Sequence, residues 1–321
     1  MNVEKGFVDV PVEAGLDLAV EIKKLKEEKN AAILAHYYTV GEIQDLADFV
    51  GDSLALARIA ETLDNDIIVM CGVHFMGETV KVLCPGKKVL VPDLNAGCSL
   101  ADSCPADEFK TFVEKHPDHT VISYVNTSAA VKAHTDIVVT SGNAMKVVSS
   151  LPADEKIIFG PDRNLGNYIN SQTGREMLLW DGACHVHEQF SLEKILELKK
   201  EHPEAKVLVH PECPKPIRLV ADKIGSTAVL LEYAVEADAD EFIVATESGI
   251  LHEMRRRCPE KKFIPAPPND STCACNDCSF MKLNTLEKLY NTLRYEMPEV
   301  HVDEAIIDDA RRPIERMLKL S

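Results

Sequence analysis

Three cysteines occupy matching places in a unit that the sequence repeats. Cys98 follows a short apolar run, Cys184 comes 86 residues later after a similar run, and Cys278 follows a third run after a longer loop. If the three copies surround a common axis, their corresponding loops meet there. Three thiolates at one point suit a metal ion or an iron–sulfur cluster, with one coordination position left open.

A buried and chemically inert role is the alternative for any single cysteine. We apply that alternative to the cysteines that have no counterpart in the other copies. These are Cys71, Cys84, Cys104, Cys213 and Cys258.

Each copy also ends its first predicted strand in two polar residues spaced i and i+2. The three pairs are His36 and Tyr38, Tyr124 and Asn126, and His210 and Glu212. Residues two apart on an extended chain point to the same side, and parallel α/β sheets bind ligands at the carboxyl ends of their strands. One such pair commonly bonds only its own loop, but three pairs in register favour a shared chamber.

A hydroxyl residue follows the first member of each pair after 17 positions. These residues are Ser53, Ser141 and Thr227, and each directly precedes a predicted helix, so each is expected to be an N-cap. Capping alone is the structural alternative. A helix N-terminus also attracts anions, typically by about 0.3–1 kcal/mol at an exposed site, so three converging ends could hold a multiply charged anion.

The positions of these residues follow from three copies of one unit. The segment 114–118 matches 200–204 at an offset of 86 residues, and the segment 47–53 matches 221–227 at an offset of 174. The His36 to His210 spacing is also 174 residues. Agreement of separate matches on one offset makes coincidence improbable.

Each copy reads as a helix, a strand, a short helix or turn with a brief apolar piece, and then a helix, a strand, a helix and a strand. The predicted strands are Ala31–Ala35, Ile67–Cys71 and Lys88–Val91; Thr120–Ser123, Lys156–Gly160 and Glu176–Trp180; and Lys206–Val209, Glu241–Ala245 and Lys262–Pro265. Strands that alternate with helices predict parallel sheets with helices on both faces. The expected fold is therefore α/β, with three similar αβα layered domains related by a pseudo-threefold axis.

The expected units span residues 17–98, 99–184 and 185–278. Residues 279–321 are expected to form two helices, Thr285–Tyr295 and Asp303–Leu320, that pack back on the first unit. Pro313 should kink the second helix or begin a new one.

Composition narrows the classes of function. The chain has 321 residues, 45% of them apolar and 27% charged, which is typical of a globular protein with room for two or three cores. The net charge of −17 argues against nucleic acid or an anionic membrane as a partner. The N-terminus has no apolar signal region, so we expect a cytoplasmic protein with reduced thiols.

Three cysteines lie close together at the third ligand position, so the ligand among them has to be identified. Cys273, Cys275 and Cys278 have Cys-x-Cys and Cys-x-x-Cys spacing, which could make most of a zinc site or hold a redox disulfide. The register of the repeats selects Cys278 as the metal or cluster ligand. Cys275 is then a possible redox partner of Cys278, and Cys273 has no assigned role.

Several motifs together resemble the quinolinate synthase (NadA) family over about residues 34–289. They are Ala35-His36-Tyr37-Tyr38, Ala47-Asp48-Phe49-Val50-Gly51-Asp52-Ser53, Pro161-Asp162-Arg163-Asn164-Leu165-Gly166, Trp180-Asp181-Gly182-Ala183-Cys184-His185-Val186-His187, His210-Pro211-Glu212-Cys213, Thr246-Glu247-Ser248-Gly249 and Cys278-Ser279-Phe280-Met281-Lys282. The resemblance implies three α/β domains about a pseudo-threefold axis and a [4Fe-4S] cluster bound by Cys98, Cys184 and Cys278, which leaves one iron open as a Lewis acid.

The resemblance further implies condensation of iminoaspartate with dihydroxyacetone phosphate to quinolinate, phosphate and two waters, in NAD biosynthesis. An aspartate oxidase or dehydrogenase would supply the iminoaspartate. The substrates' anionic groups would be held by His36, Ser53, Ser141, His210 and Thr227.

The remaining site residues receive roles in moving protons and orienting the substrate. Glu212 would act as general acid or base, and Tyr38 and Tyr124 would donate hydrogen bonds or relay protons. Asn126 would orient a carbonyl or enediol, and His187 is a weaker candidate beside the cluster.

Two rival functions use the same residues. One is a zinc-stabilised α/β enzyme without a cluster, and the other is a cluster-bearing sensor that binds a small anion and signals to a partner. The acid and base groups at the strand ends favour catalysis. A reversible Cys275–Cys278 disulfide, which would remove a cluster ligand under oxidation, is a further hypothesis.

Overall fold

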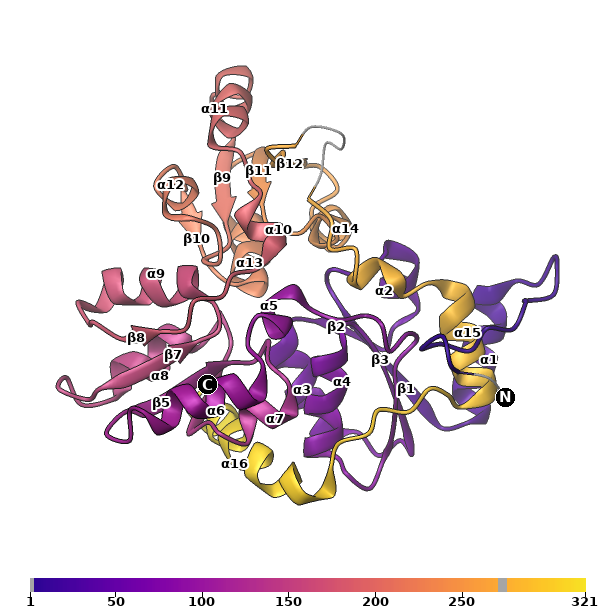
Figure 1. Ribbon diagram of the computed structural model, residues 1–321. Coiled ribbons are helices and arrows are strands. Elements are labelled where there is room, and N and C mark those ends of the chain that lie inside the picture. The colour runs from indigo at the N-terminus through magenta and orange to yellow at the C-terminus, as the bar shows by residue number, and fades with distance from the viewer. Residues whose placement is uncertain (1–2, 271–275) are drawn as a thin grey trace.

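The strands of the protein form three separate sheets, as the computed structural model shows over the residues it describes, 3–270 and 276–321 (Figure 1). The first sheet has the order β2-β1-β3-β4, and all of its strands are parallel. Its strands are β1 (Ala31–His36), β2 (Phe49–Gly51), β3 (Ile67–Cys71) and β4 (Lys88–Leu90).

The other two sheets repeat this order and direction, as β6-β5-β7-β8 and β10-β9-β11-β12. The strands of the second are β5 (Thr120–Tyr124), β6 (Ile137–Val139), β7 (Ile157–Gly160) and β8 (Leu178–Leu179). Those of the third are β9 (Lys206–Val209), β10 (Lys223–Ile224), β11 (Glu241–Ala245) and β12 (Lys262–Pro265). Figure 1 shows the three sheets as separate bodies in indigo, magenta and orange. The predicted α/β fold with three similar layered units is confirmed.

The brief apolar piece of each copy forms a strand, which the sequence did not resolve. An aspartate directly before that strand fixes it to the first strand of the sheet through two hydrogen bonds to a single residue of the first strand. The aspartate N–H donates to the carbonyl of that residue, and the aspartate Oδ2 accepts from its N–H. The pairs are Asp48 with Ile33, Asp136 with Val121 and Asp222 with Val207, all at 2.9 Å for the first bond and 2.8 Å for the second. The three copies therefore share hydrogen bonds as well as topology.

Helices connect the strands and cover the sheets, as parallel crossovers require. Those of the first unit are α1 (Leu18–Glu28), α2 (Gly41–Leu46), α3 (Ser53–Thr62) and α4 (His74–Leu83). Those of the second are α5 (Ser99–Asp102), α6 (Ala106–Glu114), α7 (Ala129–Lys132), α8 (Ala144–Ser150) and α9 (Arg163–Thr173). Those of the third are α10 (His185–Glu188), α11 (Leu192–Glu201), α12 (Lys215–Arg218), α13 (Thr227–Glu236) and α14 (Ile250–Arg257).

The C-terminal segment bridges two units. After a 3₁₀ turn (Met281–Leu283), α15 (Leu286–Tyr295) packs on α1, whereas α16 (Glu304–Leu320) packs on α7 and β6 of the second unit and on α4 of the first (Figure 1). α16 thus contacts the second unit as well as the first. Pro313 lies inside α16, and no new helix begins there.

Buried apolar side chains fill each unit and the junction of the first two. One cluster joins Leu34 and Val89 of the first unit with Ile122 and Val138 of the second, and α16 adds Ile314 to it. Among the described residues, we find no helix that is long and apolar enough to cross a bilayer.

Candidate active site and metal centre

One cavity collects the candidate residues from all three units. Its lining includes the weaker candidate His187 and all twelve main candidates from the sequence: His36, Tyr38, Ser53, Cys98, Tyr124, Asn126, Ser141, Cys184, His210, Glu212, Thr227 and Cys278. The strand-end pairs reach it because β1 ends at His36 and β5 at Tyr124, and β9 ends directly before His210. The repeat register thus brings together side chains as far apart in the chain as His36 and Cys278.

The three candidate cysteines enter the cavity in the same way. Each is a free thiol that is partly buried, and each directly precedes a short helix or a turn. The carbonyl oxygen of each accepts a hydrogen bond from the N–H four residues later, at 2.8 Å for Cys98, 3.0 Å for Cys184 and 3.2 Å for Cys278.

Burial and nearby backbone N–H groups have opposite effects on the pKa of each of the three thiols. Burial raises the pKa of Cys98 to about 12, and it also raises the pKa of Cys184 and of Cys278. Backbone N–H groups three residues later in the following turn lower each pKa, as expected for a thiol at a helix start. Such thiols give up their protons when a cation binds them.

The expectation that the three hydroxyl residues are N-caps is wrong. Asp52 caps α3 through Ala55 N–H at 2.9 Å, and Ser226 caps α13 through Val229 N–H, so Ser53 and Thr227 are the first residues of those helices. The cap of α8 is Asn143, and Ser141 lies two residues before it. All three residues line the cavity, where the Thr227 hydroxyl bonds Tyr38 and the Ser141 hydroxyl bonds His210.

A chain of hydrogen bonds crosses the cavity from the first unit to the third. The Tyr38 hydroxyl lies 2.9 Å from Oγ1 of Thr227 and 2.7 Å from Oγ1 of Thr246, and the Thr246 hydroxyl lies 3.0 Å from Nε2 of His187. Nδ1 of His187 lies 3.1 Å from Oε2 of Glu212, although the angle is outside hydrogen-bond geometry.

The second unit joins this chain through the other oxygen of the same carboxylate. The Tyr124 hydroxyl donates a hydrogen bond to Oε1 of Glu212. His210 stacks on His187 with ring centroids 4.6 Å apart, and its Nε2 lies 3.2 Å from the Ser141 hydroxyl. The chain therefore connects groups that can hold or pass a proton.

The electrostatic setting gives these groups distinct states at neutral pH. Burial alone would raise the pKa of Glu212, but His187 and the hydrogen bond from Tyr124 hold it below its usual range, so Glu212 is a carboxylate. Burial lowers the pKa of His36 and of His210 to about 3, so both rings are neutral. Burial raises the pKa of Tyr38 and Tyr124, which keeps both hydroxyls protonated.

A second set of donors could hold a single metal ion. The ligand atoms of Cys184, His187 and Glu212 lie within 4.8 Å of one another. This set supports the zinc alternative, because one thiolate, one imidazole and one carboxylate are common zinc ligands. A cluster of several irons spreads its ligands farther apart than one ion does, and the donor chemistry of Cys98, Cys184 and Cys278 fits such a cluster.

Sequence reasoning missed three buried residues at this site. Thr246 links Tyr38 to His187, Glu247 accepts a hydrogen bond from Cys278 N–H at 3.0 Å, and Asp162 accepts one from Cys184 N–H at 3.2 Å. All three lie just after a strand end, at β11 or β7. All three belong to motifs that carry the family resemblance, and their closeness to predicted strand ends is the signal that could have assigned them to the site.

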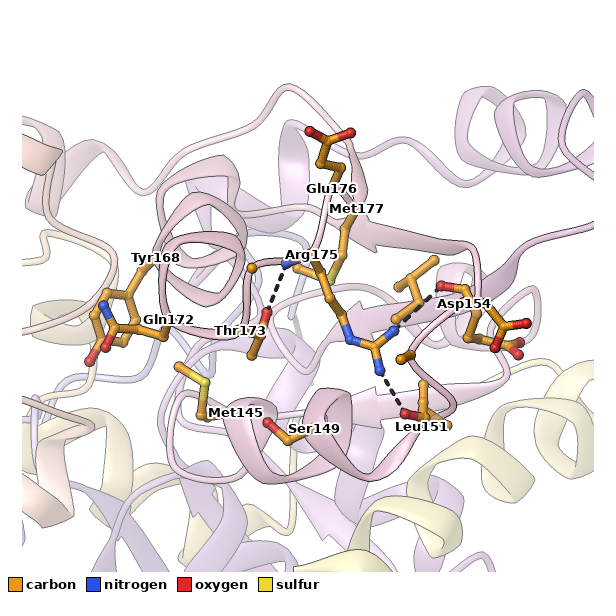
Figure 2. Close-up of a pocket in the computed structure, with 14 residues that line it drawn as sticks. Met145, Ser149, Leu151, Asp154, Tyr168, Gln172, Thr173, Arg175, Glu176 and Met177 are labelled. Carbon is orange, nitrogen blue, oxygen red and sulfur yellow. Dashed lines mark hydrogen bonds between the residues drawn. The ribbon is translucent and has the colours of Figure 1, made fainter.

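A wider depression on the surface of the second unit has a different character (Figure 2). It lies between α8 and α9, and Arg175 donates hydrogen bonds there to the backbone carbonyls of Leu151 and Glu155. The twelve candidate residues, all of which the structure describes, are absent from its lining. The guanidinium therefore holds the loop of Leu151 and Glu155 in place.

Cys273 and Cys275, and with them the proposed Cys275–Cys278 disulfide, lie outside the described residues.

The family model and similar curated proteins agree on one family. The family model described as quinolinate synthetase A protein matches residues 20–319. The chain is 56% identical over its full length to a quinolinate synthase of Synechococcus sp., covering 99% of that protein. It is 57% identical over 95% of its length to one of Thermosynechococcus vestitus, covering 96% of that protein.

A solved structure gives a much weaker match. The E-1-hydroxy-2-methyl-but-2-enyl-4-diphosphate reductase from Plasmodium falciparum covers 87% of this chain, and the match takes in 93% of that chain, with 9% identity and a TM-score of 0.31. That likeness is too weak to carry an argument.

Proposed function

The chain belongs to the quinolinate synthase family, and from that premise we propose that it condenses iminoaspartate with dihydroxyacetone phosphate. The products are quinolinate, phosphate and two waters, a balance that needs no external oxidant. The observation that carries the proposal is the cavity itself, where three free thiols from three units lie beside a buried carboxylate, the buried Tyr124 and the half-buried Tyr38.

We further propose that Cys98, Cys184 and Cys278 hold a [4Fe-4S] cluster. When bound, such a cluster with three protein ligands supplies an iron with an open position that polarises an oxygen of the substrate. The support for this choice is that the three thiols are free, line one cavity and come from equivalent positions of the repeat.

Glu212 is proposed as the general base. Its carboxylate is 3% exposed and ionised, and a buried carboxylate next to a substrate can take a proton from carbon or nitrogen. Tyr124 donates to the same carboxylate and can return a proton to a leaving oxygen. Thr246 joins Tyr38 to His187, and Nδ1 of His187 lies 3.1 Å from Oε2 of Glu212, so a small rotation of the imidazole completes a proton path from Glu212 toward the first unit.

Anionic groups of the substrates are proposed to bind at the hydroxyl side of the cavity. Ser53 and Thr227 open helices of ten residues, α3 and α13, whose N-terminal N–H groups favour an anion. Ser141, His36 and His210 add neutral hydrogen-bonding groups, and Asn126 orients a carbonyl or enediol. A locally favourable site of this kind reconciles anionic substrates with a net charge of −17.

The test is anaerobic purification with iron and sulfide quantification, followed by an assay for quinolinate. We expect about four irons per chain, since that is the content of the proposed cluster, and quinolinate formation from the two substrates. Changing Cys98, Cys184 or Cys278 to Ala should abolish both. Cys258 lies at the end of α14 in the apolar core of the third unit, so changing it to Ala should leave the iron content and quinolinate formation unchanged.

The rival functions predict other results. A zinc enzyme would be colourless and would retain zinc when Cys98 is changed. A sensor would bind the anions and keep its cluster without forming quinolinate. Either outcome would overturn the proposal.

A further inference from the structure

Two buried carboxylates hold the backbones of two of the candidate cluster cysteines. Asp162 accepts a hydrogen bond from Cys184 N–H at Oδ2, and Glu247 accepts one from Cys278 N–H at Oε1. Both carboxylates are 0% exposed. Each bond is made to the backbone N–H of a residue that would bind iron through its sulfur.

The two carboxylates are built alike although they lie in different units. Each comes two residues after the end of a strand, β7 for Asp162 and β11 for Glu247. The second oxygen of each bonds a backbone N–H a few residues later, at 2.7 Å from Leu165 in the first turn of α9 for Asp162 and at 2.7 Å from Gly249 for Glu247. One carboxylate therefore fastens the loop after the strand to the loop that carries the cysteine.

Further contacts tie both loops to neighbouring units or segments. Lys282 forms an ion pair with Glu247 at 2.8 Å and donates to the carbonyl of Tyr38 at 2.8 Å, so the Cys278 loop is joined to the first unit. Arg163, next to Asp162, donates its N–H to the carbonyl of Gly182 at 2.8 Å, close to Cys184.

The first unit lacks this device. The position two residues after β3 is Val73, which lines the same cavity and whose side chain cannot accept a hydrogen bond. Because the first unit has the same fold without this carboxylate, the fold itself does not require a carboxylate at this position.

We infer that Asp162 and Glu247 are positioning residues that hold Cys184 and Cys278 in place as cluster ligands and so set how firmly the cluster is retained. The inference rests on the proposed cluster. Residues that support metal ligands typically change metal affinity by about 10–100-fold when they are replaced.

The variants Asp162→Asn and Glu247→Gln separate this role from general support of the fold. Asparagine is as good an N-cap as aspartate, so its oxygen can still serve Leu165 N–H while its amide nitrogen faces the Cys184 N–H without accepting from it. Glutamine likewise loses one of two acceptor oxygens. Glu253→Gln is the matched control, because Glu253 is 2% exposed and ion-paired in the same unit but bonds Arg256 and Arg257.

The readout is the rate at which a chelator removes iron from the reconstituted, oxygen-free protein, followed by the loss of visible absorbance. We expect the full iron content in all variants, with iron loss about tenfold faster in Asp162→Asn and Glu247→Gln and unchanged in Glu253→Gln. If Asp162→Asn fails to fold, Asp162→Ser keeps a capping oxygen too short to reach Cys184 and should show the same acceleration.

The outcomes separate the two proposals. A wild-type protein that takes up its irons, makes quinolinate and loses iron no more slowly than the two variants would overturn the positioning role alone. A wild-type protein that takes up no iron–sulfur cluster would overturn the proposed function, and the positioning role with it.

Discussion

Gln44 and Lys132 stand at equivalent positions in the first two repeat units, and each bonds the two equivalent backbone carbonyls of the strand-end loop in its own unit. Gln44 Nε2 donates to the carbonyls of Tyr37 and Thr39, both at 2.9 Å. Lys132 Nζ donates to the carbonyl of Val125 at 2.8 Å and to that of Thr127. The residue enclosed by each pair of carbonyls is a candidate site residue, Tyr38 or Asn126.

Replacing Lys132 with Met should therefore loosen the loop that carries Asn126. Lys132 is 0% exposed, and its removal leaves two carbonyls short of a donor, which costs about 1–3 kcal/mol. Lys132→Gln should recover part of the loss, because glutamine makes the equivalent bonds in the first unit. Urea unfolding measures the stability, and the KM for the two substrates measures the loop. Equal losses in both variants would show that the nitrogen donor is unimportant.

The third unit shows why the equivalence of Gln44 and Lys132 could not be predicted from the sequence. Arg218 stands at the same register but donates to the carbonyl of Asn164 in the second unit at 3.0 Å. Glutamine, lysine and arginine share a donor nitrogen and little else, so a comparison of residue types does not align them. The strand-end pairs were predictable because their offsets of 86 and 174 residues repeat along the chain.

The errors at the hydroxyl residues have a local cause. Asp52 and Ser226 are also good caps and lie one residue earlier, so each of those helices begins one residue sooner than expected. Contacts between units, such as that of Thr246 with Tyr38, depend on how the three sheets meet, and spacing along the chain carries no record of that.

Replacing Glu212 with Gln should abolish turnover and spare the cluster. The amide keeps the size of the side chain but cannot take a proton, and loss of a general base typically costs about 10²–10⁴ in rate. Iron and sulfide content should match those of the wild type, since Glu212 is not among the three proposed thiol ligands. Quinolinate formation at saturating substrate is the measurement. Activity within a few-fold of wild type would remove Glu212 from the mechanism, and loss of metal would favour the single-ion site with Cys184 and His187.

Replacing Thr246 with Val should interrupt the path between Tyr38 and His187. Valine has nearly the same shape but lacks the hydroxyl that lies within 3.0 Å of both groups. We expect a fall in kcat of about tenfold or more with little change in KM, because the hydroxyl passes protons and does not hold substrate. Thr79→Val is the control, since that buried hydroxyl only bonds the carbonyl of Phe75 within α4. An equal effect of both substitutions, or an effect confined to KM, would contradict the relay.

Glu296 should contribute stability that depends on pH. Hydrogen bonds from Lys29 and Lys88, each at 2.7 Å, lower the pKa of Glu296 to about 2 from a usual value of 4.5. A carboxyl whose pKa is lower in the folded state stabilises the fold fully above the unfolded pKa, and this stabilisation is lost as the pH falls from about 4.5 toward 2. The side chain is 32% exposed, so solvent screening limits the effect to about 0.5–1 kcal/mol.

A double-mutant cycle isolates that effect from the other carboxyl groups that titrate in acid. Glu296→Gln and Lys29→Met, singly and together, are compared by chemical unfolding at pH 7 and at pH 3. The coupling free energy between the two residues should be positive at pH 7 and smaller at pH 3, because Glu296 takes up a proton on unfolding at pH 3, and this proton uptake favours the unfolded chain. The other carboxyl groups contribute equally to all four proteins and cancel from the cycle. A coupling free energy that is the same at both pH values, or that grows in acid, would mean that the charge on Glu296 does not stabilise this corner of the first unit.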